Sequence, residues 1–146
     1  ELDLIKDAKV EVITPACEDY PPSLREIYDP PSVLYVWGQL TKADWRCIGV
    51  VGSRRATHYG LQAAKKLSYQ IARAGLTVIS GLARGVDTAA HEGALAGGRT
   101  IAVLGSGLGK LYPPENQALA EKIAKQGAVV SDFPILYLPD KQSFPL

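Results

Sequence analysis

Three stretches of the sequence combine glycine with serine, arginine or lysine, and each one follows an apolar run. They are Gly52-Ser53-Arg54, the segment SGLARGVD at 80–87 and the segment GSGLGK at 105–110. Glycine lets backbone N–H groups approach an anion closely because it has no Cβ, and the forked donors of arginine match phosphate oxygens. These residue types predict a site that binds phosphate groups. The alternative is that the glycines only make the turns between strands and helices.

The spacings of known nucleotide-binding loops do not occur in these stretches. Gly105-Ser106-Gly107 has no third glycine at the dinucleotide spacing, and no GxxxxGK[ST] motif exists. Residues 70–74 read QIARA, so they lack the acidic residue expected about 20 positions after the first glycine turn. We therefore disfavour a nicotinamide or ATP site and predict no cofactor.

Few residues could catalyse a reaction. Asp87 and His91 stand four positions apart and could form an acid–base pair. A histidine in this position more often ties a helix to a loop, and we favour that interpretation. No serine after the apolar runs lies in a G-x-S-x-G motif, and His58 and His91 alone cannot build a metal site. The sequence therefore requires neither a catalytic residue nor a metal.

Four short, continuously apolar runs carry these loops. They begin near residues 47, 76, 99 and 127, and such runs are typical of strands buried on both faces of a parallel sheet. Their spacing of about 25–30 residues leaves room for one helix in each gap. We expect three helices. The first spans 58–74 and ends before Gly75 as C-cap. The second begins at a cap at Asp87 or Thr88 and runs to 96, and the third begins at Pro114 and ends before Gly127. The predicted fold class is α/β, a Rossmann-like three-layer fold with a mostly parallel sheet of about four core strands. Ligands of such sheets bind outside the carboxyl ends of the strands, where the three stretches lie.

Residues 1–45 differ from the rest of the chain, because proline pairs at 21–22 and 30–31 forbid long regular elements. Alternating residues predict a strand at 9–15, and a β-branched and aromatic run predicts another at 32–38. Between them we expect one or two helical turns with Ser23 as N-cap. We interpret 1–45 as a Pro-rich lead-in segment that packs on the core, and 46–146 as the main domain.

Composition places the chain among ordinary globular domains. It has 146 residues and a formal net charge of +1, so any binding of nucleic acid must come from a local basic patch. Cys17 and Cys47 lack metal-ligand spacing, and we favour two free thiols in a reducing cytoplasm over one disulfide. We find no apolar stretch of 18 residues and no signal peptide. Because the chain starts at Glu1 and contains no methionine, we expect it to be a fragment.

Five motifs, in order along the chain, together resemble the DNA-processing protein A family (DprA, also called Smf). They are YPPSLREIYDPPSVLYVWGQL, VGSRRATHYG, SGLARGVDTAAHEGAL, TIAVLGSGLGKLYPPENQ and the closing SFP. The resemblance implies a bacterial cytoplasmic protein that binds single-stranded DNA, acts in natural transformation, loads the RecA recombinase and forms homodimers. It also implies that the protein is not an enzyme and has no membrane partner. The implied DNA-binding residues are Gly52, Ser53, Arg54, Ser80, Gly81, Arg84, Gly85, Gly105, Ser106 and Gly107.

Some features depart from the family or stay open. The chain ends where the family continues, so we expect an exposed apolar sheet edge and a missing part of the DNA pocket. Gly109-Lys110 replaces an acidic and an apolar residue, so Lys110 could add local charge, and 135–140 (ILYLPD) has no functional account. Arg55 is expected to face solvent. The candidates for stacking on a base are Tyr59, Tyr112 and Tyr137. There are two alternatives to DNA binding. One is a nucleoside-phosphate enzyme or sensor on a related fold, which we disfavour because the signature PGGxGTxxE is missing. The other is a purely structural module.

Overall fold

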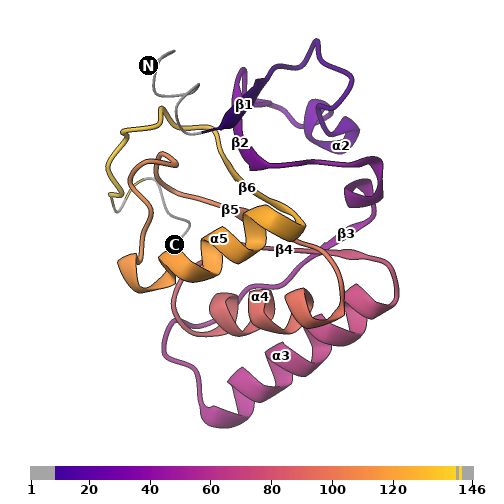
Figure 1. Ribbon diagram of the computed structural model, residues 1–146, viewed down its shortest axis with the longest axis vertical. Coiled ribbons are helices and arrows are strands. Elements are labelled where there is room, and N and C mark those ends of the chain that lie inside the picture. The colour runs from indigo at the N-terminus through magenta and orange to yellow at the C-terminus, as the bar shows by residue number, and fades with distance from the viewer. Residues whose placement is uncertain (1–8, 141, 143–146) are drawn as a thin grey trace.

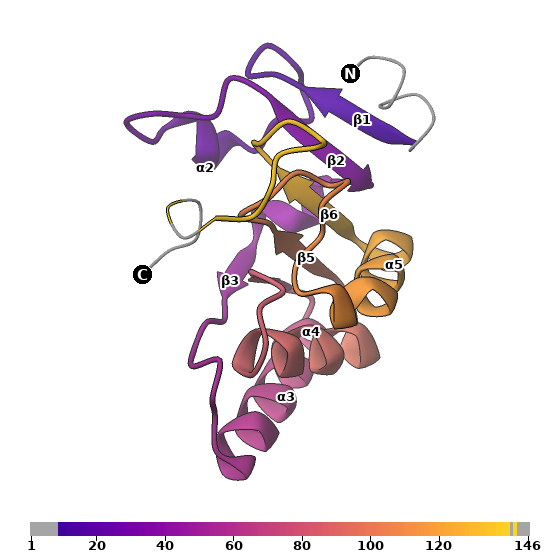
Figure 2. The same cartoon turned by 90° about the vertical axis from the view of Figure 1, so that its left-hand side faces the viewer.

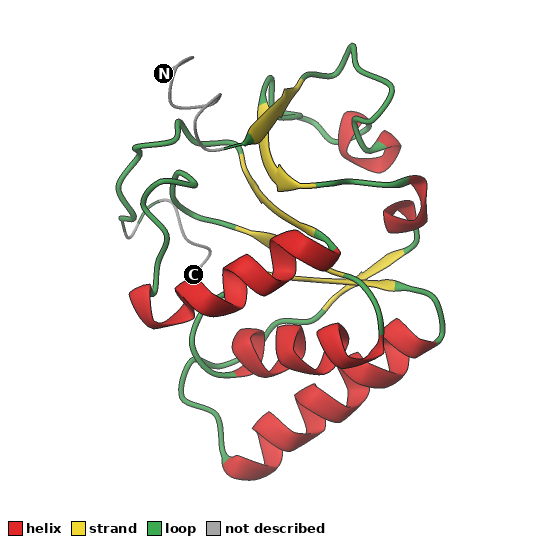
Figure 3. Ribbon diagram, viewed as in Figure 1, coloured by secondary structure: helices red, strands yellow, loops and turns green. Residues whose placement is uncertain are grey.

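The computed structural model describes residues 9–140 and residue 142. One six-stranded sheet runs through the molecule in the order β1-β2-β6-β5-β4-β3 (Figures 1 and 3). The strands are β1 (Val10–Ile13), β2 (Leu34–Gly38), β3 (Cys47–Gly49), β4 (Thr77–Ser80), β5 (Thr100–Val103) and β6 (Ala128–Ser131). The helical elements are α2 (Pro22–Arg25), η1 (Lys42–Trp45), α3 (His58–Arg73), α4 (Val86–Gly97), η2 (Pro114–Asn116) and α5 (Gln117–Gln126).

The four apolar runs form the parallel strands β3, β4, β5 and β6, as predicted. Each crossover from β3 to β6 moves one strand along the sheet in the same direction. Right-handed connections therefore place α3, α4 and α5 on the same face, and Figures 1 and 2 show them as a single layer of adjacent helices. The α/β class and the mostly parallel sheet are confirmed.

The segment before β3 completes the sheet instead of only packing on it. β2 pairs antiparallel with β6, with Val36 opposite Val130, and β1 pairs antiparallel with β2. On the face without the three helices, Tyr20 is fully buried in a cluster with Val36, Ile101 and Val130. The N-terminal segment therefore protects one side of the parallel strands. Among the described residues, the outer edge of β3 has no strand beside it, and Ile48 on this edge is 41% exposed.

Two of the three predicted caps were wrong. The helix predicted to follow Ser23 begins two residues earlier, with Pro21 as N-cap and Pro22 at its first position, because the fixed φ of proline suits that position. Helix α4 begins after Gly85 without a side-chain cap, since the Asp87 carboxylate accepts hydrogen bonds from the preceding loop. Gly75 does end α3: it has a φ of +88°, and its N–H donates to the Ala72 carbonyl at 3.0 Å.

At the amino ends of the strands, a buried ion pair joins η1 to the sheet. The Asp44 carboxylate accepts two hydrogen bonds of 2.8 Å from Arg99, one of 2.7 Å from the Thr77 hydroxyl and one of 2.8 Å from the Thr41 N–H. Burial acts to raise the pKa of Asp44, but these donors outweigh it and leave the pKa below its ordinary value of 3.8.

We expect this pair to make the fold sensitive to acid. A carboxyl group with a lowered pKa stabilises the folded state above the pKa of the unfolded chain, and this contribution is lost as the pH falls from 3.8 through the lower folded value. The variant Asp44→Asn should lose about 2 kcal/mol of stability at pH 7, because Arg99 keeps no charged partner there. Urea unfolding at pH values from 7 down to 2 checks this. A wild-type protein and a variant that lose stability in parallel on acidification would contradict it.

Candidate functional site

The loops that follow the parallel strands meet at one edge of the sheet, because all four strands point the same way. The three stretches of glycine, serine and basic residues lie in the loops after β3, β4 and β5. The site that the sequence predicts therefore comes together at this edge, which we call the carboxyl edge.

The loops after β3 and β4 touch each other at Gly85. The Val86 N–H donates to the Ser53 carbonyl at 3.1 Å. Gly85 has a φ of +81°, and a Cβ there would lie 2.3 Å from the Ser53 carbonyl oxygen and 2.7 Å from that of Arg54. This contact is possible only with glycine. It places Arg54 and Arg84, both exposed, on two loops in direct contact.

The other glycines of the predicted site also allow close packing. A Cβ on Gly52 would lie 2.8 Å from the Val86 side chain, and one on Gly107 would lie 2.0 Å from the Pro134 carbonyl oxygen. Gly105 and Gly107 are buried. The Gly81 N–H donates to the Asp87 carboxylate at 3.1 Å, so this amide already has an anionic partner. Contact of these glycines with a ligand stays a prediction, while their role in packing is visible.

The predicted serines divide into one surface residue and two buried ones. Ser53 is exposed, and its hydroxyl oxygen accepts from the Arg55 N–H at 3.1 Å. The Ser80 hydroxyl is buried and donates to the Val50 carbonyl at 2.7 Å. Ser106 is 1% exposed, and its carbonyl accepts from the Ser131 hydroxyl at 2.7 Å. Ser80 and Ser106 therefore hold the shape of the edge, and Ser53 is the serine whose side chain an approaching ligand can reach.

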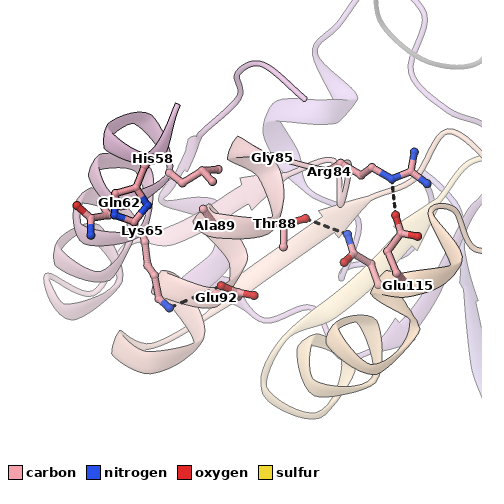
Figure 4. Close-up of a pocket in the computed structure, with 11 residues that line it drawn as sticks. His58, Gln62, Lys65, Arg84, Gly85, Thr88, Ala89, Glu92 and Glu115 are labelled. Atoms are coloured by element: carbon pink, nitrogen blue, oxygen red, sulfur yellow. Dashed lines mark hydrogen bonds and ion pairs between the residues drawn. The ribbon is translucent and has the colours of Figure 1, made fainter. Parts of the chain in front are cut away.

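Arg84 is the basic residue with the most defined surroundings. Its Nε donates to the Glu115 carboxylate (Figure 4). Its Nη1 donates to the Tyr112 hydroxyl at 3.1 Å, and its guanidinium carbon lies 5.3 Å from the centre of the Tyr112 ring. The hydrogen bond from Arg84 lowers the pKa of Glu115, and the same bond raises the pKa of Arg84. Each group thus favours the charged form of the other.

Sequence reasoning missed Glu115, and Asn116 next to it explains why Glu115 reaches Arg84. The buried Asn116 amide donates to the Leu82 carbonyl and to the Thr88 hydroxyl, both at 2.9 Å. These two acceptors lie on either side of Arg84 in the chain. Asn116 therefore fixes η2 against the loop that carries Arg84. In the sequence, Glu115 and Asn116 stand in the run YPPEN, which belongs to a motif of the family but does not by itself indicate a contact with Arg84.

A shallow cleft of about 440 Å³ opens beside this pair, between α3, α4 and η2. Figure 4 shows Lys65 and Glu92 at one end and Arg84 and Glu115 at the other. The Lys65 ammonium lies 3.6 Å from the Glu92 carboxylate, so charges of both signs line the cleft.

Asp87 and His91 do not form a pair. Asp87 binds the loop after β4, whereas His91 is fully buried with its Nδ1 2.8 Å from the Thr100 hydroxyl. That hydroxyl donates its proton to the Val78 carbonyl at 2.8 Å, so His91 Nδ1 donates to it. Burial lowers the pKa of His91 to about 4, and the ring is neutral at pH 7. His91 is a hydrogen-bonding core residue, as expected, but it ties α4 to strand β5 and not to a loop.

The remaining predicted surface residues fall into separate places. Arg55 is exposed, as predicted, and Lys110 is exposed as well. Tyr59 is 80% exposed on the first turn of α3. Tyr112 lies under Arg84, and the Tyr137 ring stacks on Phe133 with ring centres 4.4 Å apart. Of the three candidate stacking residues, Tyr112 lies against a predicted phosphate-binding arginine.

Comparison with known proteins shows to which family the chain belongs. Residues 11–146 match the model of the family described as DNA recombination-mediator protein A. The chain belongs to this family. It is 41% identical over 140 residues to Protein Smf of Synechocystis, with 92% of this chain and 35% of that protein covered. It is 38% identical to DNA processing protein DprA of Bacillus subtilis, with 97% and 48% covered.

Two solved structures of the family have the same fold. The X-ray structure of DNA processing protein A from Streptococcus pneumoniae superposes with a TM-score of 0.86 at 36% identity, covering 99% of this chain and 52% of that one. The Helicobacter pylori protein, whose structure is described for its single-stranded DNA binding mode, superposes with a TM-score of 0.81 at 31% identity, covering 93% and 61%. The Rossmann-like fold is thereby confirmed. The chain spans about half, or less, of the length of these two curated relatives, Smf and DprA.

The described part of the chain contains no cluster of three or more histidine, cysteine or acidic side chains that could bind a metal ion. None of its helices is long and apolar enough to span a membrane. Within residues 9–140 and 142, Cys17 and Cys47 are both free thiols, as predicted. The two closing motif residues Phe144 and Pro145, and Ser143 before them, lie outside the described residues.

Proposed function

We propose that the carboxyl edge of this sheet binds the phosphate backbone of single-stranded DNA. The observation that carries the proposal is the contact of two loops that each present an exposed arginine, Arg54 and Arg84, at the edge where parallel sheets bind their ligands. Family membership and the Helicobacter pylori relative support DNA as the source of the phosphates. Contacts to phosphates alone carry no sequence information, so binding should tolerate any sequence.

The experiment is fluorescence anisotropy with labelled 20-nucleotide strands, dT20 and a mixed sequence, and with a duplex of the mixed sequence. We expect the full-length protein to bind both single strands with affinities within about threefold of each other and to bind the duplex more weakly. The slope of log K against log salt should be about −1.4 or steeper, since each phosphate contact on a single strand contributes about −0.7. Equal affinity for strand and duplex, or a flat salt dependence, would contradict the proposal. Hydrolysis of a nucleoside monophosphate would favour the alternative of an enzyme.

The family resemblance supports a wider proposal for the whole protein. We propose a cytoplasmic, non-enzymatic homodimer that acts in DNA processing and natural transformation by loading RecA on single strands. Sedimentation of the full-length protein tests the dimer. The rate of RecA filament growth on dT-rich strands, with and without the protein, tests the loading.

A further inference from the structure

Glu115 stands where a phosphate would bind Arg84. A guanidinium presents two forked faces to an anion, one formed by Nε and Nη2 and one formed by Nη1 and Nη2. Glu115 accepts from Nε and the Tyr112 hydroxyl binds Nη1, so each face has one nitrogen engaged within the protein. A phosphate cannot take the Nε face until the carboxylate leaves it.

The position of Glu115 is built into the fold and is not a chance meeting of two long side chains. Asn116 is buried, and its amide hydrogen bonds to Leu82 and Thr88 tie η2 to both sides of the loop that carries Arg84. The two side chains themselves remain about half exposed, at 50% for Arg84 and 55% for Glu115. The backbone under the carboxylate is therefore fixed, while the carboxylate can rotate away into solvent.

The pair contributes little to folding. Ion pairs between exposed side chains are screened by water and add little to stability. Its effect on an anion is larger, because a carboxylate beside the guanidinium cancels most of the local positive charge that would attract a phosphate.

We propose that Glu115 is an internal competitor for Arg84, a carboxylate that occupies the phosphate site of the free protein and is displaced by the DNA backbone. The proposal rests on the proposed binding of single-stranded DNA. The competition sets the affinity of the edge. It also disfavours isolated phosphate ions, which must displace Glu115 without the help of further contacts along a strand.

The test is the variant Glu115→Gln in the full-length protein, measured by anisotropy with labelled dT20. We expect three- to tenfold tighter binding, because a phosphate that binds Arg84 then no longer has to displace a carboxylate from it. The matched control is Glu121→Gln, which removes the same charge from an exposed position on α5 and should change affinity less than twofold. Thermal unfolding of each variant checks that the fold is intact.

A double-mutant cycle separates competition for Arg84 from a general effect of charge. In the Arg84→Ala background, Glu115→Gln should lose most of its effect. The same gain with and without Arg84, or a gain no larger than that of Glu121→Gln, overturns the role of Glu115 while wild-type binding upholds the proposed function. A wild-type protein that does not bind dT20 overturns the proposed function itself.

Discussion

Replacing both arginines of the carboxyl edge, Arg54→Ala with Arg84→Ala, is expected to weaken binding of single-stranded DNA about 100-fold. Each charge-assisted hydrogen bond to a phosphate contributes about 1.5–3 kcal/mol, so each single variant should lose at least about tenfold. Because the two loops touch at Gly85, we expect both arginines to engage phosphates of the same strand. Anisotropy with dT20 and with a mixed sequence measures the loss.

The dependence of the lost affinity on DNA sequence and on salt is as informative as its size. Removal of phosphate contacts should weaken all sequences alike and lower the steepness of the salt dependence by about 0.7 for each arginine. A loss confined to certain sequences would indicate that an arginine reads bases, which contradicts a role in backbone binding.

The control for this pair removes the same charge from other places. Arg55 follows Arg54 directly and is exposed, and Arg73 is exposed in the last turn of α3, at the far end of the helix from the carboxyl edge. We expect Arg55→Ala with Arg73→Ala to cost less than about threefold in affinity, as a loss of two non-contacting charges should. If this control variant loses as much affinity for single-stranded DNA as the Arg54→Ala, Arg84→Ala variant, the binding arises from general charge and not from the two loops.

Local patterns in the sequence predicted the parts of the fold that depend on neighbours in the chain. The apolar runs gave the four parallel strands, and the three- and four-residue spacing gave α3 almost to the residue. Gly75 was recognisable as a helix end because a Schellman motif needs a left-handed residue there. The meeting of three glycine-containing loops at one edge followed from parallel strand direction alone.

Contacts between segments that are distant in the sequence could not be predicted from such local patterns. Arg84 and Glu115 are 31 positions apart, and Arg99 and Asp44 are 55 apart. No periodicity encodes such a pairing, because it depends on how loops of different elements fold against each other. The pairing of β2 with β6 is of the same kind, since a β-branched and aromatic run predicts a strand but not its partner.

The glycines of the three stretches have two interpretations, contact with an anion and the making of turns. They are predicted to bring N–H groups to an anion, which stays a prediction, and several of them also let one loop lie against another, as Gly107 does at Pro134. These roles are linked, because loops that could not approach would not hold Arg54 and Arg84 at one edge. A glycine that is required for packing is therefore also required for the geometry of the site.

Gly85→Ala is expected to destabilise the fold by about 2–6 kcal/mol. A non-glycine residue at a φ of +81° carries backbone strain of about 1–3 kcal/mol. The new Cβ would also lie 2.3 Å from the Ser53 carbonyl oxygen, an overlap with backbone that costs about 1–3 kcal/mol more. Because the overlap pushes apart the loops of Arg54 and Arg84, the folded fraction of the variant should also bind single-stranded DNA more weakly.

Substitutions at two other glycines separate the two contributions to the loss of stability, the backbone strain and the overlap of the new Cβ. Gly75 has a φ of +88°, but a Cβ added there would meet nothing within 4 Å, so Gly75→Ala should cost only the backbone strain, about 1–2 kcal/mol. Gly49 has neither feature, and Gly49→Ala should change stability by less than about 1 kcal/mol. Urea unfolding of the three variants measures the series. If Gly85→Ala loses no more than Gly75→Ala, the loops can move apart freely, and the contact at Gly85 does not hold the two arginines in place.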